Sequence, residues 1–277
     1  MSLLLTTALI GVGAFLAGLL GSLTGLGGGI VIVPLLTLAF GADIRYAVGA
    51  SLVAVIATSS GAGATYVKEG FTNIRVGMLL EVATVTGALG GAYLATVIPA
   101  NAIAILFAVM VLFTALQSLR PGQEDVTVLA GPLARRLRLG SSYPTERGPV
   151  RYEVRRVPLG LALMGLAGVL SALLGIGSGV VKVLAMDRAM GLPFKVSTTT
   201  SNFMMGVTAA ASAGIYLQRG YINPVLTFPV LLGVLAGAST GARLLSGAPT
   251  RALRLLFTGA VVLLALELLY KGVSGGL

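Results

Sequence analysis

The sequence contains no cysteine and no histidine among its 277 residues. Their absence excludes disulfides, thiol chemistry, zinc sites built on those ligands, haem held by histidine, and a serine nucleophile activated by histidine. Aspartate occurs only at Asp43, Asp125 and Asp187, far apart in the chain, which leaves no aspartate pair for an intramembrane protease. We therefore expect no enzyme, no bound metal and no cofactor.

Charge is also scarce. Charged residues make up 10% of the chain and apolar residues 56%, whereas a soluble domain carries roughly 25% charge. A water-soluble chain this poor in charge could not cover its own surface, so lipid is the expected solvent for most of it. The basic residues behind the net charge of +10 cluster in loops and at helix ends, which is the pattern of membrane topology and not of nucleic-acid binding.

Ten apolar segments fall into two sets of five, separated by residues 121–157, the only long polar stretch. The N-terminal segment lacks a basic leader and is expected to remain in the protein as its first membrane helix. The second segment of each set is shorter than the roughly 20 residues of a spanning helix, so we expect a half-helix, a re-entrant piece or a short embedded span. The segments cover 3–23, 29–40, 46–67, 74–97 and 100–119, then 158–174, 179–191, 196–217, 223–246 and 251–270.

The two sets match each other at an offset of 150 residues (175 − 25 = 150), without a gap from Gly18 to Phe107. Glycine, proline, tyrosine and asparagine stay in register over this length, which shared composition alone would not produce. The sequence therefore predicts an internal duplication, a feature common in transporters. Residues 1–120 form the first predicted repeat, 121–157 an Arg-rich linker and 158–277 the second repeat.

Charge also predicts the orientation. The Arg-rich linker should lie on the cytoplasmic side of a cell membrane. If the short segments cross the membrane, each repeat has five crossings and the repeats are inverted. If they are re-entrant, each has four crossings and the repeats are parallel, which would place several cations of the second half outside. We favour inverted repeats in an all-α polytopic membrane protein.

Two glycine-rich breaks interrupt the apolar pattern, and each opens a short segment. The glycines expose backbone N–H groups, and a helix N-terminus with free N–H groups attracts anions. Broken helices at matching points of two repeats point to a transporter's binding site, although a tight turn or close helix crossing would need the same glycines. The candidate residues are Thr24, Gly25, Gly27, Gly28 and Gly29 in the first break and Gly177, Ser178 and Gly179 in the second.

A run of hydroxyl side chains begins the third segment of the second repeat. Capping a helix uses one or two hydroxyls, so the surplus predicts a cavity lined with hydrogen-bond donors. The run comprises Ser197, Thr198, Thr199, Thr200, Ser201 and Asn202, and Ser51 is the first-repeat equivalent of Ser201.

Charged residues within apolar segments are the remaining candidates, because an unpaired lysine at the centre of a membrane helix costs about 2.5–3.5 kcal/mol on insertion scales. Lys182 follows the second break, and Lys195 and Arg45 are repeat equivalents. A pairing of Lys182 with Asp187 is the structural alternative. Glu81 is a candidate for carrying a coupling proton, although it could also lie at a helix end.

The two glycine-rich breaks, Pro34, the Gly41 and Gly191 turns and the hydroxyl run before Asn202 together resemble the TauE/SafE sulfite exporter family. The resemblance covers nearly the whole chain outside 121–157, with Ser178 departing from the Gly28 of the first break. It implies transport of a sulfur-containing anion, such as sulfite, thiosulfate or an organosulfonate, driven by an ion gradient. The residues independently favour an anion: the candidate site is rich in cations and donors and poor in acids.

We therefore expect a secondary transporter that works by alternating access of its two repeats. An anion channel, or a transporter of another small anion, is the alternative. The expected partners are a small anionic substrate, membrane lipid and a coupling proton or cation, with no nucleic acid.

Overall fold

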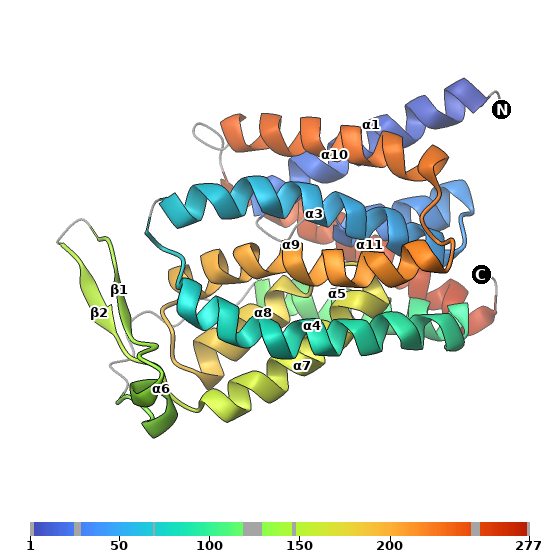
Figure 1. Cartoon of the computed structure of the whole chain (residues 1–277). Coiled ribbons are helices and arrows are strands. Elements are labelled where there is room, and N and C mark those ends of the chain that lie inside the picture. Colours follow the sequence, from blue (N-terminus) through green and yellow to red (C-terminus); the bar gives the residue numbers. More distant parts are fainter. Residues whose placement is uncertain are drawn as a thin grey trace.

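The computed structural model describes residues 3–24, 29–68, 70–118, 129–145, 148–244 and 250–275. These residues form a body of helices with a small polar appendage at one end (Figure 1). The first half contains α1 (Leu3–Thr24), α2 (Gly29–Pro34), α3 (Ile44–Lys68), α4 (Ile74–Val97) and α5 (Ala100–Ser118). The second half contains α7 (Val157–Leu174), α8 (Gly179–Leu184), α9 (Phe194–Gln218), α10 (Pro224–Leu244) and α11 (Thr250–Ser274).

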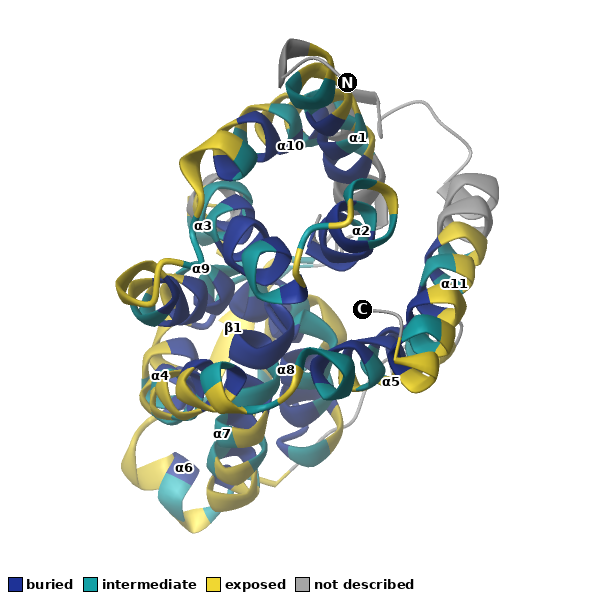
Figure 2. Cartoon of the chain, turned by 90° about the vertical axis from the view of Figure 1, so that its right-hand side faces the viewer, coloured by how far each residue is buried: buried dark blue, intermediate teal, exposed yellow. Residues whose placement is uncertain are grey.

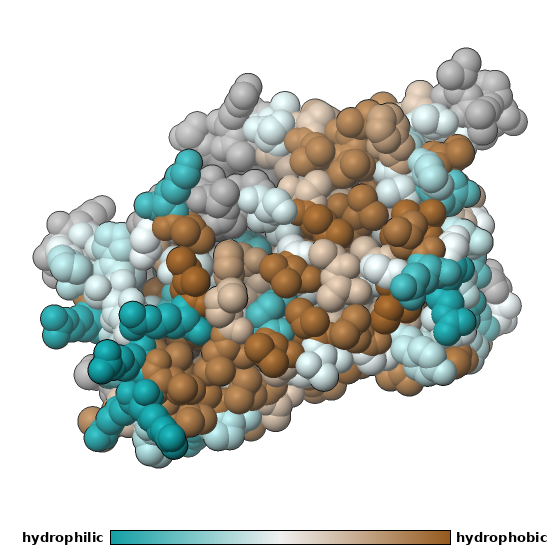
Figure 3. Space-filling view, viewed as in Figure 1, coloured by the Kyte–Doolittle hydropathy of each residue, from teal (hydrophilic) through white to brown (hydrophobic). Residues whose placement is uncertain are grey.

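The surface of this body is that of a membrane protein. Figure 3 shows a broad apolar belt across the middle of the helices, with polar residues gathered toward the two ends. Within the described residues, α4, α5 and α7 are long and apolar enough to cross a membrane. On α4, Met78 and Val82 are exposed while Leu80 and Glu81 are buried. Apolar side chains therefore face outward, as lipid requires, and a carboxylate faces inward.

Two tight helix pairs flank the centre. In Figure 2, which looks along the helices, α1 with α10 and α4 with α7 lie on opposite sides of α3, α8 and α9. A Cβ on Gly87 of α4 would meet the Gly165 carbonyl oxygen of α7 at 2.0 Å, and one on Gly237 of α10 would meet that of Phe15 of α1 at 2.0 Å. Backbones can approach this closely only where no side chain intervenes.

The two short helices are each extended by a π-helical turn. These turns cover Leu35–Ala39 after α2 and Ala185–Ala189 after α8. Each combined element has 11 residues (6 + 5) and is therefore about 16 Å long, close to half of the roughly 30 Å hydrocarbon core. The start of the first element lies against the break before α8, because a Cβ on Gly29 would lie 2.7 Å from the Gly175 carbonyl oxygen.

The chain breaks before α8 because its backbone turns left-handed. Gly175, with φ of +67°, ends α7, and Ser178, with φ of +47°, precedes α8. A left-handed residue cannot continue a right-handed helix. The second predicted break is therefore present, and the short elements have the boundaries expected from the sequence to within two residues.

Helices α3 and α9 run in opposite directions. The Arg45 side chain at the start of α3 donates to the Ala95 and Ile98 carbonyls at the end of α4, at 3.0 and 2.8 Å. At the start of α9, Thr200 accepts a hydrogen bond from the Asn73 N–H just before α4, at 3.0 Å. The two helices therefore begin at opposite ends of the molecule, although they hold the same position in the two halves.

The polar stretch between the halves has structure that its composition did not predict. Its described residues form the short helix α6 (Pro132–Arg136) and an antiparallel hairpin of β1 (Ser141–Tyr143) and β2 (Val150–Tyr152), with Ser142 opposite Arg151. Ala134, Leu139 and Val154 are buried beneath them. These apolar residues, with hydrogen bonds from Asn73 to the Leu139 carbonyl and to the Tyr152 hydroxyl, hold an otherwise polar segment against the helices.

The close crossings make a testable prediction. Gly87→Ala should destabilise the protein by about 1–3 kcal/mol, because the added methyl group collides with the α7 backbone. Gly90→Ala is the matched control: nothing lies within 4 Å of a Cβ there, and alanine favours a helix over glycine by about 1 kcal/mol. Thermal unfolding of the detergent-purified variants measures both, and equal stability of the two would contradict the crossing.

Candidate functional site

A fully buried lysine lies at the centre of the helical body. Lys182 belongs to α8, three residues after the helix begins at Gly179, and its exposed fraction is 0%. The break before α8 places the lysine at this depth, because a continuous spanning helix would have begun at the surface. A charged side chain in this position requires partners inside the protein.

Two side chains from other helices provide those partners. The Lys182 Nζ donates to the Thr208 Oγ1 of α9 at 2.7 Å. The Thr208 hydroxyl in turn donates to the Glu81 Oε1 of α4 at 2.7 Å. Thr208 is completely buried and Glu81 is 8% exposed. The three residues therefore form a chain of ammonium, hydroxyl and carboxylate across α8, α9 and α4.

The electrostatics of this chain are balanced but incompletely satisfied. The opposite charges of Lys182 and Glu81 compensate each other, which reduces the large cost of holding either one away from water. The Glu81 Oε2 is buried and has no hydrogen-bond partner among the described residues. The Thr208 hydroxyl also lies 3.0 Å from the Met204 carbonyl oxygen, so its single proton has two alternative acceptors. The chain can therefore change partners with small movements.

The second glycine-rich break adjoins this chain. The Ser51 Oγ of α3 donates to the Gly175 carbonyl oxygen at 2.6 Å, and the Ser201 Oγ of α9 donates to that of Gly179 at 3.3 Å. The buried Ser178 Oγ has no hydrogen-bond partner in the described part of the chain. A narrow cavity beside it is lined by Ile30, Met110, Thr114, Ile176, Ser178, Gly179, Val180 and Val181. Ser51, Gly177, Ser178, Gly179, Lys182 and Ser201 are thus gathered in one region.

Most hydroxyl groups of the run form hydrogen bonds with backbone groups. Thr198 and Thr199 bond to carbonyls of the preceding turn, Thr199 also bonds to the Phe71 carbonyl at 3.1 Å, and Ser197 lies 3.5 Å from the Leu192 carbonyl. Thr200 receives the Asn73 N–H, and Asn202 is half-buried. The run therefore secures the first turn of α9 against the start of α4, and only Ser201 reaches the break.

Lys195 and Arg45 lie away from the buried lysine. Lys195 is exposed, with its Nζ 3.9 Å from the centre of the Phe71 ring. It precedes Thr208 by 13 residues, or about 20 Å of helix. Arg45 caps the end of α4 and lies 3.9 Å from the Asp43 carboxylate. These equivalent cations occupy opposite ends of the molecule.

The first glycine-rich break is described only in part. Gly25, Gly27 and Gly28 lie outside the described residues, and the Thr24 side chain is likewise not described. Gly29 contacts the second break. In the described part of the chain, no cluster of three carboxylates suited to a metal ion is present.

The sequence did not single out Thr208. One threonine in an apolar helix carries no signal of its own. Thr208 is 26 residues from Lys182 and 127 residues from Glu81. No short-range sequence pattern links residues so far apart. A polar residue facing two buried charges could be recognised only after the helices had been placed.

Comparison with known proteins identifies the family. The sequence model described as "Sulfite exporter TauE/SafE" matches residues 10–268. The chain belongs to this family. It is 25% identical over 269 residues to "Probable membrane transporter protein YunE" of Bacillus subtilis (strain 168), covering 93% of this chain and 95% of that protein. It is 29% identical over 230 residues to "Probable membrane transporter protein YdhB" of the same organism, covering 83% and 86% of the two chains.

A third relative is "Probable membrane transporter protein ORF9" of Sinorhizobium sp, which is 23% identical over 263 residues and covers 95% of this chain and 92% of its own length. No solved structure matches the chain. This TauE/SafE member thus has relatives named as membrane transporters along nearly its entire length, and the buried lysine lies within the matched region.

The pairing of Lys182 with Glu81 predicts strong coupling between them. Lys182→Met should cost about 3–5 kcal/mol of stability, because it leaves Glu81 buried without its cation, whereas Lys182→Met combined with Glu81→Leu should recover most of that loss. Thermal or denaturant unfolding of Lys182→Met, Glu81→Leu and the double variant measures the coupling. Ile32→Met, at the first-repeat position equivalent to Lys182, is a volume-conserving control with a cost below about 1.5 kcal/mol. Additive losses in the double variant would show that the two charges do not interact.

Proposed function

We propose that the protein is a secondary transporter of a small sulfur-containing anion in the cell membrane, and that Lys182 binds the anion. The buried lysine carries this proposal. Its ammonium group is the strongest anion-attracting feature inside the apolar body, and it lies beside hydroxyl groups and the backbone of a helix start. Sulfite, thiosulfate and sulfonate oxygens accept charge-assisted hydrogen bonds from such donors. The sulfur chemistry itself is taken from the family name.

The arrangement of the halves supports inverted repeats. Under the offset of 150 residues, the α1–α10 pair maps onto the α7–α4 pair, and the Gly237–Phe15 contact maps onto Gly87–Gly165. The opposite directions of the equivalent helices α3 and α9 fit five elements per repeat and do not fit the parallel alternative. Inverted repeats provide two conformations of similar energy that open toward opposite sides.

The enclosure of Lys182 favours alternating access over an open channel. Its side chain has no exposed surface, so a solute can reach it only after helices move. The partners of Lys182 come from both halves, because Glu81 lies in the first and Thr208 in the second. Movement of one half against the other would therefore change the site itself.

Glu81 is the proposed carrier of a coupling proton. While Glu81 is ionised, it neutralises Lys182 and competes with an incoming anion. Protonation of Glu81 releases the ammonium group to bind the anion. Proton binding and anion binding then favour each other, as linkage requires, which corresponds to transport of both in the same direction.

The orientation follows from the basic residues. Arg135, Arg136, Arg138, Arg151, Arg155 and Arg156 lie in the described part of the linker, which the positive-inside rule assigns to the cytoplasm. We also propose that the helices contact membrane lipid and that the protein has no nucleic-acid partner.

Ligand binding to the purified protein tests the substrate proposal. Sulfite, thiosulfate, sulfoacetate or taurine should raise the unfolding temperature, since a ligand of the folded state stabilises it by mass action. Lys182→Gln should weaken binding at least about tenfold, equivalent to 1.4 kcal/mol. Lys195→Gln, at the exposed end of α9, should change it little.

Each contrary result has a distinct meaning. Stabilisation only by carboxylates or neutral solutes would remove the sulfur assignment but retain a transporter. Loss of binding in Lys195→Gln but not in Lys182→Gln would move the site to the end of α9. Flux through proteoliposomes that never accumulates the anion against its gradient would favour a channel.

Proton coupling is tested with Glu81→Gln. The native protein should take up about one proton per anion bound and should bind the anion more tightly as the pH falls, because the mechanism requires protonated Glu81. Glu81→Gln should bind the anion without proton uptake and with little dependence on pH. Calorimetry in buffers of different ionisation enthalpy measures the proton count. Glu267→Gln, in an exposed pair with Lys271 at 3.7 Å, is the control, and unchanged proton uptake in Glu81→Gln would exclude this role.

A further inference from the structure

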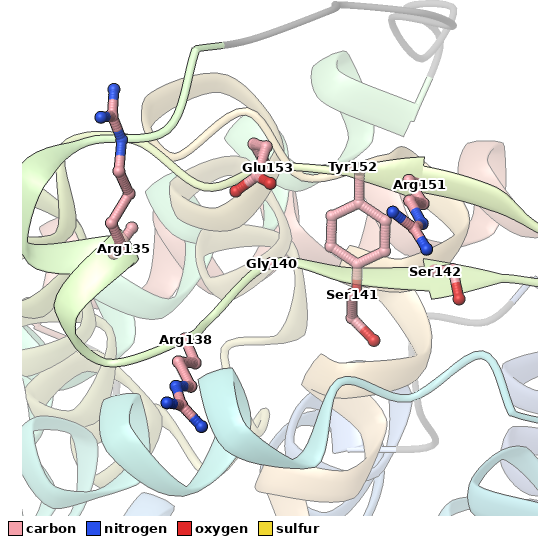
Figure 4. A pocket seen from close by; sticks show the side chains of 9 residues that line it. Arg135, Arg138, Gly140, Ser141, Ser142, Arg151, Tyr152 and Glu153 are labelled. Atoms are coloured by element: carbon pink, nitrogen blue, oxygen red, sulfur yellow. The ribbon is translucent and has the colours of Figure 1, made fainter.

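A cationic pocket lies in the linker, outside the apolar body. Its volume is about 470 Å³, within the range of small-molecule sites. Helix α6, the turn that follows it and both strands of the hairpin form its walls. Figure 4 shows Arg135 and Arg138 on one side and Arg151 on the other, with Glu153 and Tyr152 between them. Ser141 and Ser142 of β1 complete the polar lining.

Among the described residues, the three arginines form no ion pair with a carboxylate. The ion pairs of the described residues join Arg45 to Asp43 and Lys271 to Glu267, so no described carboxylate lies within ion-pair distance of the guanidinium groups of Arg135, Arg138 and Arg151. The Glu153 carboxylate lies over Gly140, where a Cβ would come within 2.7 Å of its Oε2. The lining therefore carries a formal charge of +2 (three arginines and one glutamate).

The floor of the pocket provides neutral hydrogen-bonding groups. The Tyr152 hydroxyl accepts from the Asn73 Nδ2 at 2.9 Å. Burial raises the pKa of Tyr152, against the opposing effect of hydrogen bonds with Asn73 and Ser141, so the phenol stays protonated. The Ser141 and Ser142 hydroxyls lie beside it on β1 and can donate to a bound oxyanion.

We infer that this linker pocket binds a phosphate-bearing anion through Arg135, Arg138 and Arg151. The planar guanidinium fork matches two oxygens of a phosphate group, and several arginines around one concave surface are suited to a phosphate ester or a diphosphate. The ligand is either a soluble phosphate ester or the phosphate headgroup of a lipid at the membrane surface, because both present the same group.

The pocket is connected to the helices of the candidate transport site. Asn73 donates to Tyr152 and to the Leu139 carbonyl at 3.0 Å, caps α4 by accepting from the Val76 N–H at 3.0 Å, and donates its own N–H to Thr200 of α9. Helices α4 and α9 carry Glu81 and Thr208. A ligand that ties α6 to the hairpin therefore stabilises the linker against the starts of these two helices.

Binding of pyrophosphate to the lipid-depleted full-length protein in neutral detergent is the first test, measured by calorimetry at low ionic strength. The combined variant Arg135→Gln, Arg138→Gln and Arg151→Gln should bind pyrophosphate about a hundredfold more weakly or not at all. Arg136→Gln, Arg188→Gln and Arg219→Gln together remove the same charge from exposed positions outside the pocket, and should change the affinity less than about threefold.

A second set of variants guards against misfolding and against confusion with the transport site. Replacing the three pocket arginines with lysine keeps the charge but removes the fork, and should weaken binding about tenfold. Lys182→Gln should leave pyrophosphate binding unchanged, so that this inference and the transport proposal fail independently. Absence of pyrophosphate binding, or equal losses in the two glutamine triples, would overturn the assignment.

Lipid competition then identifies the source of the phosphate. Phosphatidic acid in mixed micelles should displace pyrophosphate at lower concentration than phosphatidylglycerol if the natural ligand is a headgroup with a terminal phosphate. Failure of both lipids to displace it assigns the pocket to a soluble phosphate ester. Both results support a phosphate site, whereas equal displacement by either lipid and by sulfate would show only general attraction of anions and contradict it.

Discussion

The contact that runs from the Lys182 ammonium group through the Thr208 hydroxyl to the Glu81 carboxylate joins three helices in the apolar interior. Each charge alone would be costly to bury, since Lys182 has no exposed surface and Glu81 is 8% exposed. The positions of α4, α8 and α9 are therefore tied to one another. This contact requires three features: the break before α8, the close approach of α4, and a Thr208 side chain at the same depth as Lys182 and Glu81.

Glycine makes that geometry attainable. Gly87 brings α4 against the α7 backbone, and α7 leads directly into the break before α8. The left-handed residues Gly175 and Ser178 then redirect the chain so that α8 begins inside the body. A bulkier residue at either kind of position would move Lys182 relative to Glu81. These uncharged residues therefore determine how far the Lys182 ammonium group lies from the Glu81 carboxylate.

Much of the helical framework could be predicted from the sequence, because apolar runs, glycine-rich breaks and turn residues are local signals. The boundaries of α4 and the position of the break at Gly177–Gly179 are examples. The partners of Lys182 could not be predicted in this way. Asp187 is near Lys182 in sequence, but the hydrogen bonds of Lys182 lead through Thr208 to Glu81. Contacts of this kind depend on how the helices are placed. The hydroxyl run at the start of α9 was predicted to line a cavity, and its local pattern could not show which of its hydroxyls bond to backbone carbonyls. The hairpin was missed because Ala134, Leu139 and Val154 are too few and too widely spaced to form a periodic pattern.

The charges at the centre do not follow the predicted duplication. At the offset of 150 residues, Lys182 corresponds to Ile32, Glu81 to Leu231 and Thr208 to Thr58, which bonds only to carbonyls of its own helix. On the proposed inverted repeats, the scaffold offers two related conformations, while the described residues place one cation and one acid at its centre. On the proposed function, this favours one anion moving with one proton in each cycle. The acid comes from one half and the cation from the other, so a movement that separates the halves also frees the lysine. Their return restores the ion pair and expels the anion.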